Sequence, residues 1–500
     1  MHGNFTVNDW MIVLIYLVAV SAIGSFFYRR RSSSAEYFLG GRRMRVIPVA
    51  ISLVAADMSG MTVMGAPAWA YGHNLELFLG TLTYLFVAPI VMYLFLPFYS
   101  RFKFYTGYQY LERRFDVKVR LLGSALFLLT RGAHVAIVIY VPSIVMSLLT
   151  GLPLAACVLL TGALTTLYTT LGGMKAVIWT DVLQFSILLA GVIGVFWASL
   201  SRVPGGVVAA YHVALHAGRF HMLNFSLNPH HLTSVWAMVL GSGSLLLSTL
   251  GTDQACLQRY FTTRSLAEGR KSVLFDALIA VPVVGLLHML GFALFAYYHF
   301  YPARLAGLPM TDEILPYFVV HELHGVLVGL TIAAIFAASM AVVGAGINSL
   351  ATVTTIDFYQ RLLHNDQSQP RGVLVGRLAT MGWGAAATGA ALFANRLGPL
   401  VNAFNLVNGF LGGSILGVFL LGMLTFRAKP SATIVGGICG LTVVALVAWR
   451  LDISFFYYSL IGVLVTFSVG YLLSLNGPAR GREELKGLVF QWAASRSVAE

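Results

Sequence analysis

One long apolar stretch of this sequence is interrupted by polar residues. Residues 55–62 read AADMSGMT, so a carboxylate, two hydroxyls and a glycine fall within a stretch long enough to span a membrane. Because lipid has no water to satisfy backbone groups, irregular backbone persists at membrane depth only where it lines a protein cavity. An acid in such a stretch is costly and indicates a functional site. The segment therefore predicts a small-molecule site at the middle of a membrane protein.

Composition agrees with this class. The chain has 500 residues, of which 58% are hydrophobic and 10% charged, and its mean hydropathy is +0.80. These values exclude an ordinary soluble protein. Thirteen apolar stretches have spanning length, and they centre near residues 10–28, 46–68, 74–98, 121–149, 153–171, 176–200, 234–252, 273–299, 325–353, 374–395, 399–425, 432–449 and 454–475. We expect an all-α polytopic membrane protein with one transmembrane domain over residues 1–475 and a cytoplasmic tail over residues 476–500.

The net charge of +13 is unevenly distributed between the loops. If the N-terminus is outside, the inner loops hold the basic residues of 29–45, 101–120, 259–271 (including Arg259), 361–371 and 427–429, and the tail adds more. The outer loops hold only Arg202, Arg219, Arg304, Arg396 and Arg450. This bias predicts an outside N-terminus and a cytoplasmic C-terminus in a bacterial-type inner (plasma) membrane, and it favours lipid over nucleic acid as the partner of the basic residues.

Several classes of protein find no support in the motifs. Three cysteines, Cys157, Cys256 and Cys439, lie in or beside apolar stretches and predict neither a disulfide framework nor a metal site. There is no Walker-type glycine loop, HExxH motif or serine elbow, so neither ATP-driven transport nor a membrane hydrolase is expected. We predict that the protein is not an enzyme and needs no cofactor beyond a coupling ion.

A second interrupted stretch suggests an internal repeat. The seventh stretch carries residues 241–244, GSGS, five stretches after the first break. Interrupted segments at matching places in two halves are typical of inverted-repeat transporters, whose site lies at the repeat interface. The repeats would cover about residues 46–200 and 234–425. The competing interpretation is that these glycines only allow helices to pack closely.

Six motifs occur in a fixed order along the chain. They are residues 37–42 (YFLGGR), 57–60 (DMSG), 172–181 (GGMKAVIWTD), 252–254 with 258–260 (TDQ and QRY), 314–317 (ILPY) and 332–338 (IAAIFAA). From about Asp9 to Leu475 the chain resembles the sodium/solute symporters of the LeuT-type fold, in particular their bacterial proline and sialic acid branches. The resemblance implies cation-coupled transport of a solute by alternating access.

The resemblance also implies where the ion binds. In the family, sodium lies where the broken helix meets the ninth stretch. Its backbone ligands align with Ala55, Met58 and Ala338, and its two hydroxyl ligands align with Ala341 and Val342, which carry no hydroxyl. Relatives with a second sodium use hydroxyls that align with Gly344 and Ala345, whereas the family carboxylate in this neighbourhood is kept as Asp181.

This departure makes the sodium site doubtful and leaves three possibilities open. A shift in register could use Ser339 as a ligand, water could fill the missing positions, or the protein could have replaced sodium by protons or by uncoupled exchange. In the last case Asp57 and Asp181 are candidate proton carriers, because burial favours the neutral carboxyl.

Candidate solute ligands flank the break and the facing stretches. Asp57 could contact a cationic group of the solute, hold the ion or cap the free backbone, and Ser59, Gly60 and Thr62 adjoin it. Arg131 and His134 could bind a carboxylate; His134 aligns with an arginine that binds the solute carboxylate in the sialic acid branch, although a core histidine is the alternative. Thr81, Ser242 and Ser244 lie where family solute sites form. Asp181 could instead form an internal salt bridge, Lys175 is expected at the cytoplasmic rim, and buried Asp276 has no assigned role.

These observations favour a cation-coupled symporter of a small polar organic solute, such as an amino acid, sugar or carboxylate. Sodium is the ion that the resemblance implies. A proton-coupled or sodium-independent transporter is the alternative, and a non-transporting solute sensor or a channel is a further one. The oligomeric state is not indicated by the sequence.

Overall fold

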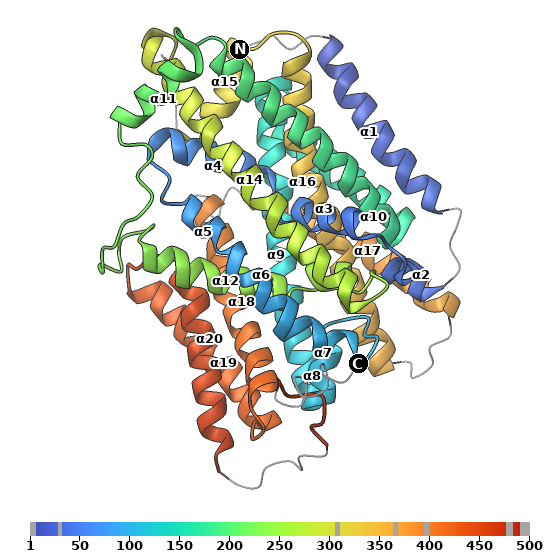
Figure 1. Cartoon of the computed structure of the whole chain (residues 1–500). Coiled ribbons are helices and arrows are strands. Elements are labelled where there is room, and N and C mark those ends of the chain that lie inside the picture. The colour runs from blue at the N-terminus through green and yellow to red at the C-terminus, as the bar shows by residue number, and fades with distance from the viewer. Residues whose placement is uncertain are drawn as a thin grey trace.

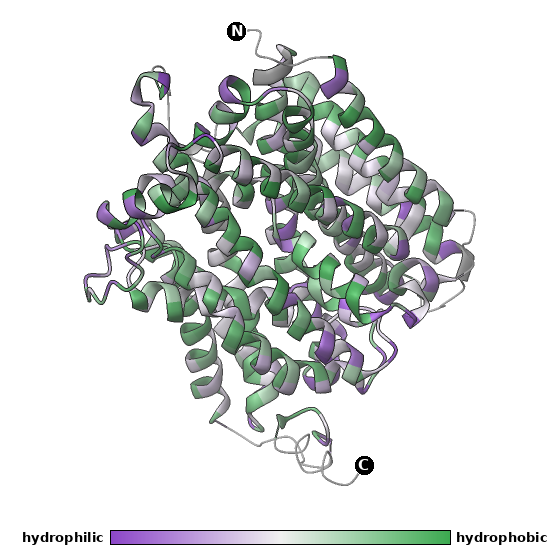
Figure 2. Ribbon diagram, turned by 45° about the horizontal axis from the view of Figure 1, so that its top comes forward, coloured by the Kyte–Doolittle hydropathy of each residue, from purple (hydrophilic) through white to green (hydrophobic). Residues whose placement is uncertain are grey.

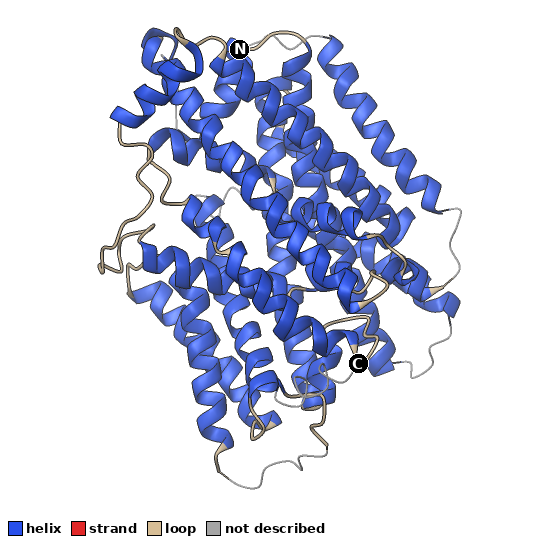
Figure 3. Cartoon of the chain, viewed as in Figure 1, coloured by secondary structure: helices blue, strands red, loops and turns tan. Residues whose placement is uncertain are grey.

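The computed structural model describes residues 7–28, 33–305, 311–363, 369–394, 400–476 and 484–490, and these residues form helices joined by loops (Figure 3). The helices in chain order are α1 (Val7–Tyr28), α2 (Ser34–Leu39), η1 (Gly40–Arg42), α3 (Val46–Asp57), α4 (Gly60–Gly72), α5 (Phe78–Leu82), α6 (Tyr84–Ile90), η2 (Val91–Phe95), α7 (Leu96–Ser100), α8 (Tyr108–Arg114), α9 (Val117–Thr150), α10 (Leu154–Leu200), α11 (Gly206–His216), η3 (Ala237–Ser242), α12 (Gly243–Thr252), α13 (Gln254–Tyr260), α14 (Leu266–Phe300), η4 (Pro302–Leu305), η5 (Thr311–Glu313), α15 (Ile314–Glu322), α16 (Val326–Val353), η6 (Thr354–Leu363), α17 (Gln369–Ala391), α18 (Leu400–Leu424), α19 (Pro430–Arg450) and α20 (Tyr457–Ser474).

The helices have the composition of membrane spans. Within the described ranges, eight helices are long and apolar enough to cross a membrane, and the bent pair of α3 and α4 brings the number to nine. Hydrophobic residues cover most of the helical surface, and hydrophilic residues concentrate in connecting segments and at a few positions inside the bundle (Figure 2). The predicted all-α polytopic class is therefore confirmed.

All thirteen predicted apolar stretches fall on described helices or on runs of short helices. Stretches 153–171 and 176–200 are continuous in α10, which has 47 residues and is kinked at Gly173, where φ is +61°. A side chain could not fit at this kink, because a Cβ on Gly173 would lie 2.7 Å from the carbonyl oxygen of Tyr37. Parts of the predicted tail (477–483 and 491–500), together with residues 29–32 of the first inner loop, lie outside the described residues.

Helix α16 is the centre of the bundle. All but a few of its residues, from Val328 to Val353, are buried. It packs against α1, α9, α10 and α3, which surround it in the sequence-coloured view (Figure 1). Small residues at Ala337, Ala341 and Gly344 let these neighbours approach closely, as small residues do in membrane helix interfaces.

A buried ionic network fixes the end of the bundle where α8, α9 and η6 meet. Arg120 on α9 donates to Asp357 of η6 across 2.5 Å, and it also binds Glu112 of α8 at 2.6 Å. The hydroxyls of Thr106 and Ser124 donate to the same Asp357 carboxylate at 2.7 and 2.8 Å. The network satisfies every oxygen of Asp357, so the buried charge is compensated.

We predict that Asp357→Ala lowers the free energy of unfolding by about 3 kcal/mol, the lower end of the range for breaking a buried ion pair, because Arg120 keeps Glu112 as a partner. Thermal melting of the purified protein in detergent measures this. Asp452→Ala, at an exposed position, is the matched control and should melt like the wild type. Equal melting of the two variants would contradict a stabilising role for the network.

Candidate solute and ion site

The break between α3 and α4 forms the base of the site. Helix α3 ends at Asp57, α4 begins at Gly60, and the two axes differ by 67°. Met58 and Ser59 between them are extended, with ψ of 91° and 167°. A helix end leaves backbone carbonyls free and a helix start leaves N–H groups free, so the break presents both kinds of group at membrane depth.

Asp57 faces open space inside the bundle. Its side chain is exposed although its neighbours Ala55, Ala56 and Met58 are buried. The hydroxyl of Tyr84 on α6 donates to its Oδ2 at 2.6 Å, and the charges of Arg131 and Asp253 act on it through space. A carboxylate held in this way is oriented by one strong hydrogen bond and still has an oxygen available for a ligand.

A cavity of about 370 Å³ lies beside the break, between α4, α5, η3 and α14. Three residues that the sequence predicted as solute ligands, Thr62, Thr81 and Ser242, line it together. They come from three separate elements. The contact between α5 and η3 is close, since a Cβ on Gly80 would lie 3.1 Å from Ser242 Oγ. The volume falls within the range of about 300–1,000 Å³ that is usual for small-molecule sites.

Two ring nitrogens in the wall of this cavity were not foreseen from the sequence. Trp69 Nε1 and His288 Nε2 are buried and have no hydrogen-bond partner among the described residues. His288 Nδ1 donates to the carbonyl of Val284 at 2.9 Å, which leaves Nε2 of the neutral ring as an acceptor. Buried polar groups are normally paired, so an unpaired donor and an unpaired acceptor indicate places where a polar ligand completes the hydrogen bonding.

Other predicted ligands lie away from the cavity. Arg131 and His134 are buried on α9, and Arg131 Nη1 is 3.8 Å from Asp253 Oδ2. Ser244 on α12 faces α20, with its hydroxyl 3.2 Å from that of Ser459. None of these three residues lines the cavity. In this conformation Arg131 contacts the carboxylate of Asp253 instead of lining the cavity.

The predicted ion ligands are all buried. Ala55, Met58 and Ala338 are buried, as are Ala341 and Val342, which have no side-chain oxygen. Gly60 packs directly on α16, since a Cβ there would lie 2.4 Å from Ser339 Oγ. The hydroxyls of Ser59 and Ser339 are buried and have no partner among the described residues. Ser339, the candidate substitute ligand, thus places a hydroxyl without a partner among the described residues next to the break, and its role in binding the ion stays a prediction.

Asp181 forms an internal salt bridge. Arg259 Nη2 lies 2.7 Å from its Oδ2, and Ser52 Oγ donates to the same oxygen at 2.5 Å. Arg259 Nε in turn donates to Ser52 Oγ at 2.7 Å. The sequence grouped Arg259 with the charges of an inner loop, but α13 carries its side chain into the interior, where it is 1% exposed. The triad joins α3, α10 and α13.

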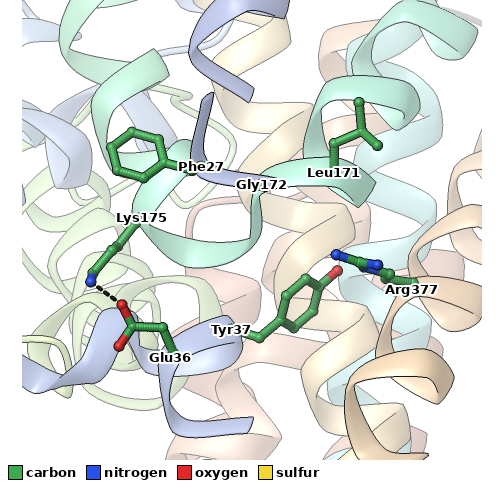
Figure 4. Close-up of a pocket in the computed structure, with 7 residues that line it drawn as sticks. All are labelled: Phe27, Glu36, Tyr37, Leu171, Gly172, Lys175 and Arg377. Carbon is green, nitrogen blue, oxygen red and sulfur yellow. Dashed lines mark hydrogen bonds and ion pairs between the residues drawn. The ribbon is translucent and has the colours of Figure 1, made fainter. Parts of the chain in front are cut away.

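A second, smaller cavity is formed by α1, α2, α10 and α17 and shares no lining residue with the first. It has a volume of about 60 Å³, and Figure 4 shows its lining residues, Phe27, Glu36, Tyr37, Leu171, Gly172, Lys175 and Arg377. Lys175, predicted at the cytoplasmic rim, pairs there with Glu36. Since this pair already neutralises the lysine, we assign no solute role to the small cavity.

Together these features define a class of protein. A helix broken at membrane depth packs through Gly60 against Ser339 of a central helix, and a cavity with hydroxyl side chains in its wall adjoins the break. This is the arrangement of a secondary transporter that binds its ion and its solute at discontinuous helices.

Comparisons with known proteins identify the family. The model of the Sodium:solute symporter family matches residues 37–440. The sodium/sialic acid symporter NanT of Aliivibrio fischeri is 32% identical over 94% of this chain and 93% of its own length, and human sodium-coupled monocarboxylate transporter 1 is 32% identical over 88% and 73%. A solved structure of a Na+-coupled sialic acid symporter, substrate-bound and outward-open, has a TM-score of 0.87 at 28% identity, covering 95% of this chain and 99% of that one.

This chain belongs to the sodium:solute symporter family. The predicted LeuT-type fold is confirmed, as is the prediction that the protein is a multi-pass transporter and not an enzyme. At the level of the family, sodium-coupled symport of a small organic solute is confirmed as well.

We predict that Gly60→Ala lowers the free energy of unfolding by about 1–3 kcal/mol, the usual cost of overpacking, because the new methyl group meets Ser339 Oγ. The double variant Gly60→Ala/Ser339→Ala removes that contact and should recover the wild-type melting temperature. Gly65→Ala is the matched control in the same half-helix, since a Cβ there meets nothing within 4 Å. If Gly65→Ala were as unstable as Gly60→Ala, backbone freedom rather than contact with α16 would explain the glycine.

Proposed function

We propose that this protein imports a small carboxylate-bearing organic solute together with sodium, and that the solute binds in the cavity lined by Thr62, Thr81 and Ser242. The observation that carries the proposal is the convergence of these hydroxyls with unpaired Trp69 Nε1 and His288 Nε2 in one cavity beside the break. Such a set suits a solute with both donor and acceptor groups. No acidic side chain is among the described residues that line it, which favours an anionic solute.

The start of α4 supports a carboxylate in particular. Thr62 lies in its first turn, where the backbone N–H groups of Gly60 and Met61 have no partner within the helix. Helix N-termini attract anions through these groups and through the helix dipole, and transporters use half-helices in this way. Sialic acid and monocarboxylates, which the names of the relatives specify, both carry a carboxylate and are the solutes we propose to test first.

The coupling follows from the shared break. The solute contacts the first turn of α4, whereas the ion site lies on the opposite side of the same break, against α16. An ion that holds the break against Ser339 therefore fixes the half-helix that the solute needs, and each ligand strengthens the binding of the other. We propose Ser339, with the carbonyls of Ala55, Met58 and Ala338, as the sodium ligands, since hard oxygen ligands suit this ion.

We further infer that the N-terminus is outside, that the C-terminus is cytoplasmic in a bacterial-type inner membrane, and that residues 1–475 act as one transporter domain. The concentration of basic residues in alternate loops supports this orientation.

Uptake into proteoliposomes tests the solute site. With an inward sodium gradient we expect saturable uptake of radiolabelled pyruvate or N-acetylneuraminate, and little uptake when potassium replaces sodium. Thr62→Ala and Ser242→Ala should each raise KM about two- to tenfold, as expected for the loss of one hydrogen bond. Thr442→Ala, at an exposed position of α19, is the matched control and should leave KM unchanged. Sodium-independent uptake, or equal effects of all three variants, would refute the proposed site.

The sodium dependence of the same uptake tests the ion site. Ser339→Ala should raise the sodium concentration for half-maximal uptake, because it removes the only proposed side-chain ligand. Ala341→Ser/Val342→Ser restores the family hydroxyls and should lower that concentration. Ser349→Ala is the control on the same helix, since that buried hydroxyl already donates to Gly346 at 2.8 Å. No change in either test variant would place the ion elsewhere.

A further inference from the structure

One buried acid stands apart from all the interactions described so far. Asp276 lies on α14, the helix that crosses the bundle beside α3 and α4, and is 1% exposed. Neither Oδ1 nor Oδ2 has a hydrogen-bond partner among the described residues.

The other buried aspartates show how unusual this is. Asp181 is paired with Arg259, Asp357 is paired with Arg120, and Asp9 accepts the backbone N–H of Gly329 at 2.8 Å. The interior of this protein thus compensates its buried carboxylates elsewhere, with ion pairs or hydrogen bonds. An ionised carboxylate without either costs several kcal/mol in a protein interior, so an acid in such a place is kept neutral or binds a cation.

The groups around Asp276 oppose a negative charge there. The charges that act on it are those of the Asp57 carboxylate of α3 and the Arg259 guanidinium of α13. Arg259 is already engaged by Asp181 of α10, so it offers Asp276 little compensation. Asp57 repels a second negative charge.

The other titratable groups near Asp276 are neutral phenols. The hydroxyls of Tyr84 on α6 and Tyr260 on α13 both lie within electrostatic reach of Asp276. Tyr260 Oη is buried without a partner among the described residues, and Tyr84 Oη donates to Asp57. Tyr71, a titratable group of α4, contacts the ring of Phe295 near the other end of α14. No group of three or more His, Cys, Asp or Glu side chains that could hold a metal ion occurs among the described residues, which favours the proton as the cation at Asp276.

We propose that Asp276 is a proton-binding site of the transport cycle, so that a proton moves in addition to sodium and solute. The proposal rests on the proposed transport function and extends it by a second coupled ion. In the conformation described here the carboxyl is shut off from water. The Oδ–H bond forms with a proton taken from water when the site is open to one side of the membrane.

The same bond breaks when alternating access hydrates the site from the other side and the proton returns to water there; no electrons are exchanged. Because the ionised form is tolerated only where water reaches it, proton release is tied to the change of conformation. A group that prefers different protonation states in two conformations couples the proton to the equilibrium between them.

Infrared difference spectroscopy on purified protein tests proton binding without any solute or gradient. We expect the C=O stretching band of a protonated carboxylic acid near neutral pH, its loss at alkaline pH, and its absence in Asp276→Asn, which keeps a neutral side chain of the same shape. Asp452→Asn, at an exposed position, is the matched control and should keep the band. A band that is absent from the wild type, or unchanged up to alkaline pH, would overturn the proposal.

Proteoliposomes with trapped pyranine test whether the proton moves. During sodium-driven uptake of pyruvate or N-acetylneuraminate, the wild type should change the luminal pH, and an uncoupler should abolish the change. Asp276→Asn should lose this proton movement completely. Sodium-driven uptake without any change of luminal pH in the wild type would refute this inference alone. Absence of sodium-driven uptake would refute the proposed function alone, and the infrared titration would then still decide whether Asp276 exchanges a proton.

Discussion

The contact between the broken helix and α16 determines the geometry of this protein. Met58 donates its N–H to Val54 and Ser59 accepts from Val63, so the backbone groups of the break that remain are the Met58 carbonyl and the Ser59 N–H, which lipid cannot satisfy. The break also brings Gly60 so close to Ser339 that no side chain fits between them. The bend of 67°, the exposure of Asp57 and the position of Thr62 in the cavity all follow from that approach. The proposed solute site and the proposed ion site thus share one irregular segment.

The buried charges of α9, α10 and α13 pair with protein groups and do not line the proposed solute cavity. Asp181 is bound by Arg259 and Ser52, and Arg131 approaches Asp253, so two of the charges that could have met a ligand compensate other protein charges. Buried pairs of this kind are weak sources of net stability but are strongly destabilising when one partner is lost. In a protein that must alternate between conformations, they favour a few discrete arrangements of helices over a continuum. Asp276 has no such partner among the described residues. In our proposal its carboxyl is neutral while it is buried and loses its proton when water reaches it.

The sequence predicted the features that depend on the residue types within one short segment. The broken stretch predicted the break, because a membrane helix rarely tolerates an acid and a glycine together unless it is interrupted there. The ordered motifs predicted the fold, and Thr62, Thr81 and Ser242 do line one cavity. The sequence could not predict which side chains from distant segments lie next to each other. Arg259 looked like a loop charge because nothing in its neighbourhood shows that α13 turns inward, and Trp69 and His288 lie on apolar helices where any face is plausible. Arg131 and Ser244 were expected at the solute and face protein groups, since spacing fixes the face of a helix only relative to a known neighbour.

The wall of the cavity has a further implication for how such proteins diversify. Phe455 and Phe456, just before α20, line the cavity, and the backbone of Phe456 lies so close to Gly241 that a Cβ there would be 2.6 Å from its carbonyl. These residues belong to the C-terminal hairpin of α19 and α20, outside the segments that form the break and its contact with α16. Phe455 and Phe456 are therefore positions at which the wall of the cavity can change without altering the break itself or its contact with α16.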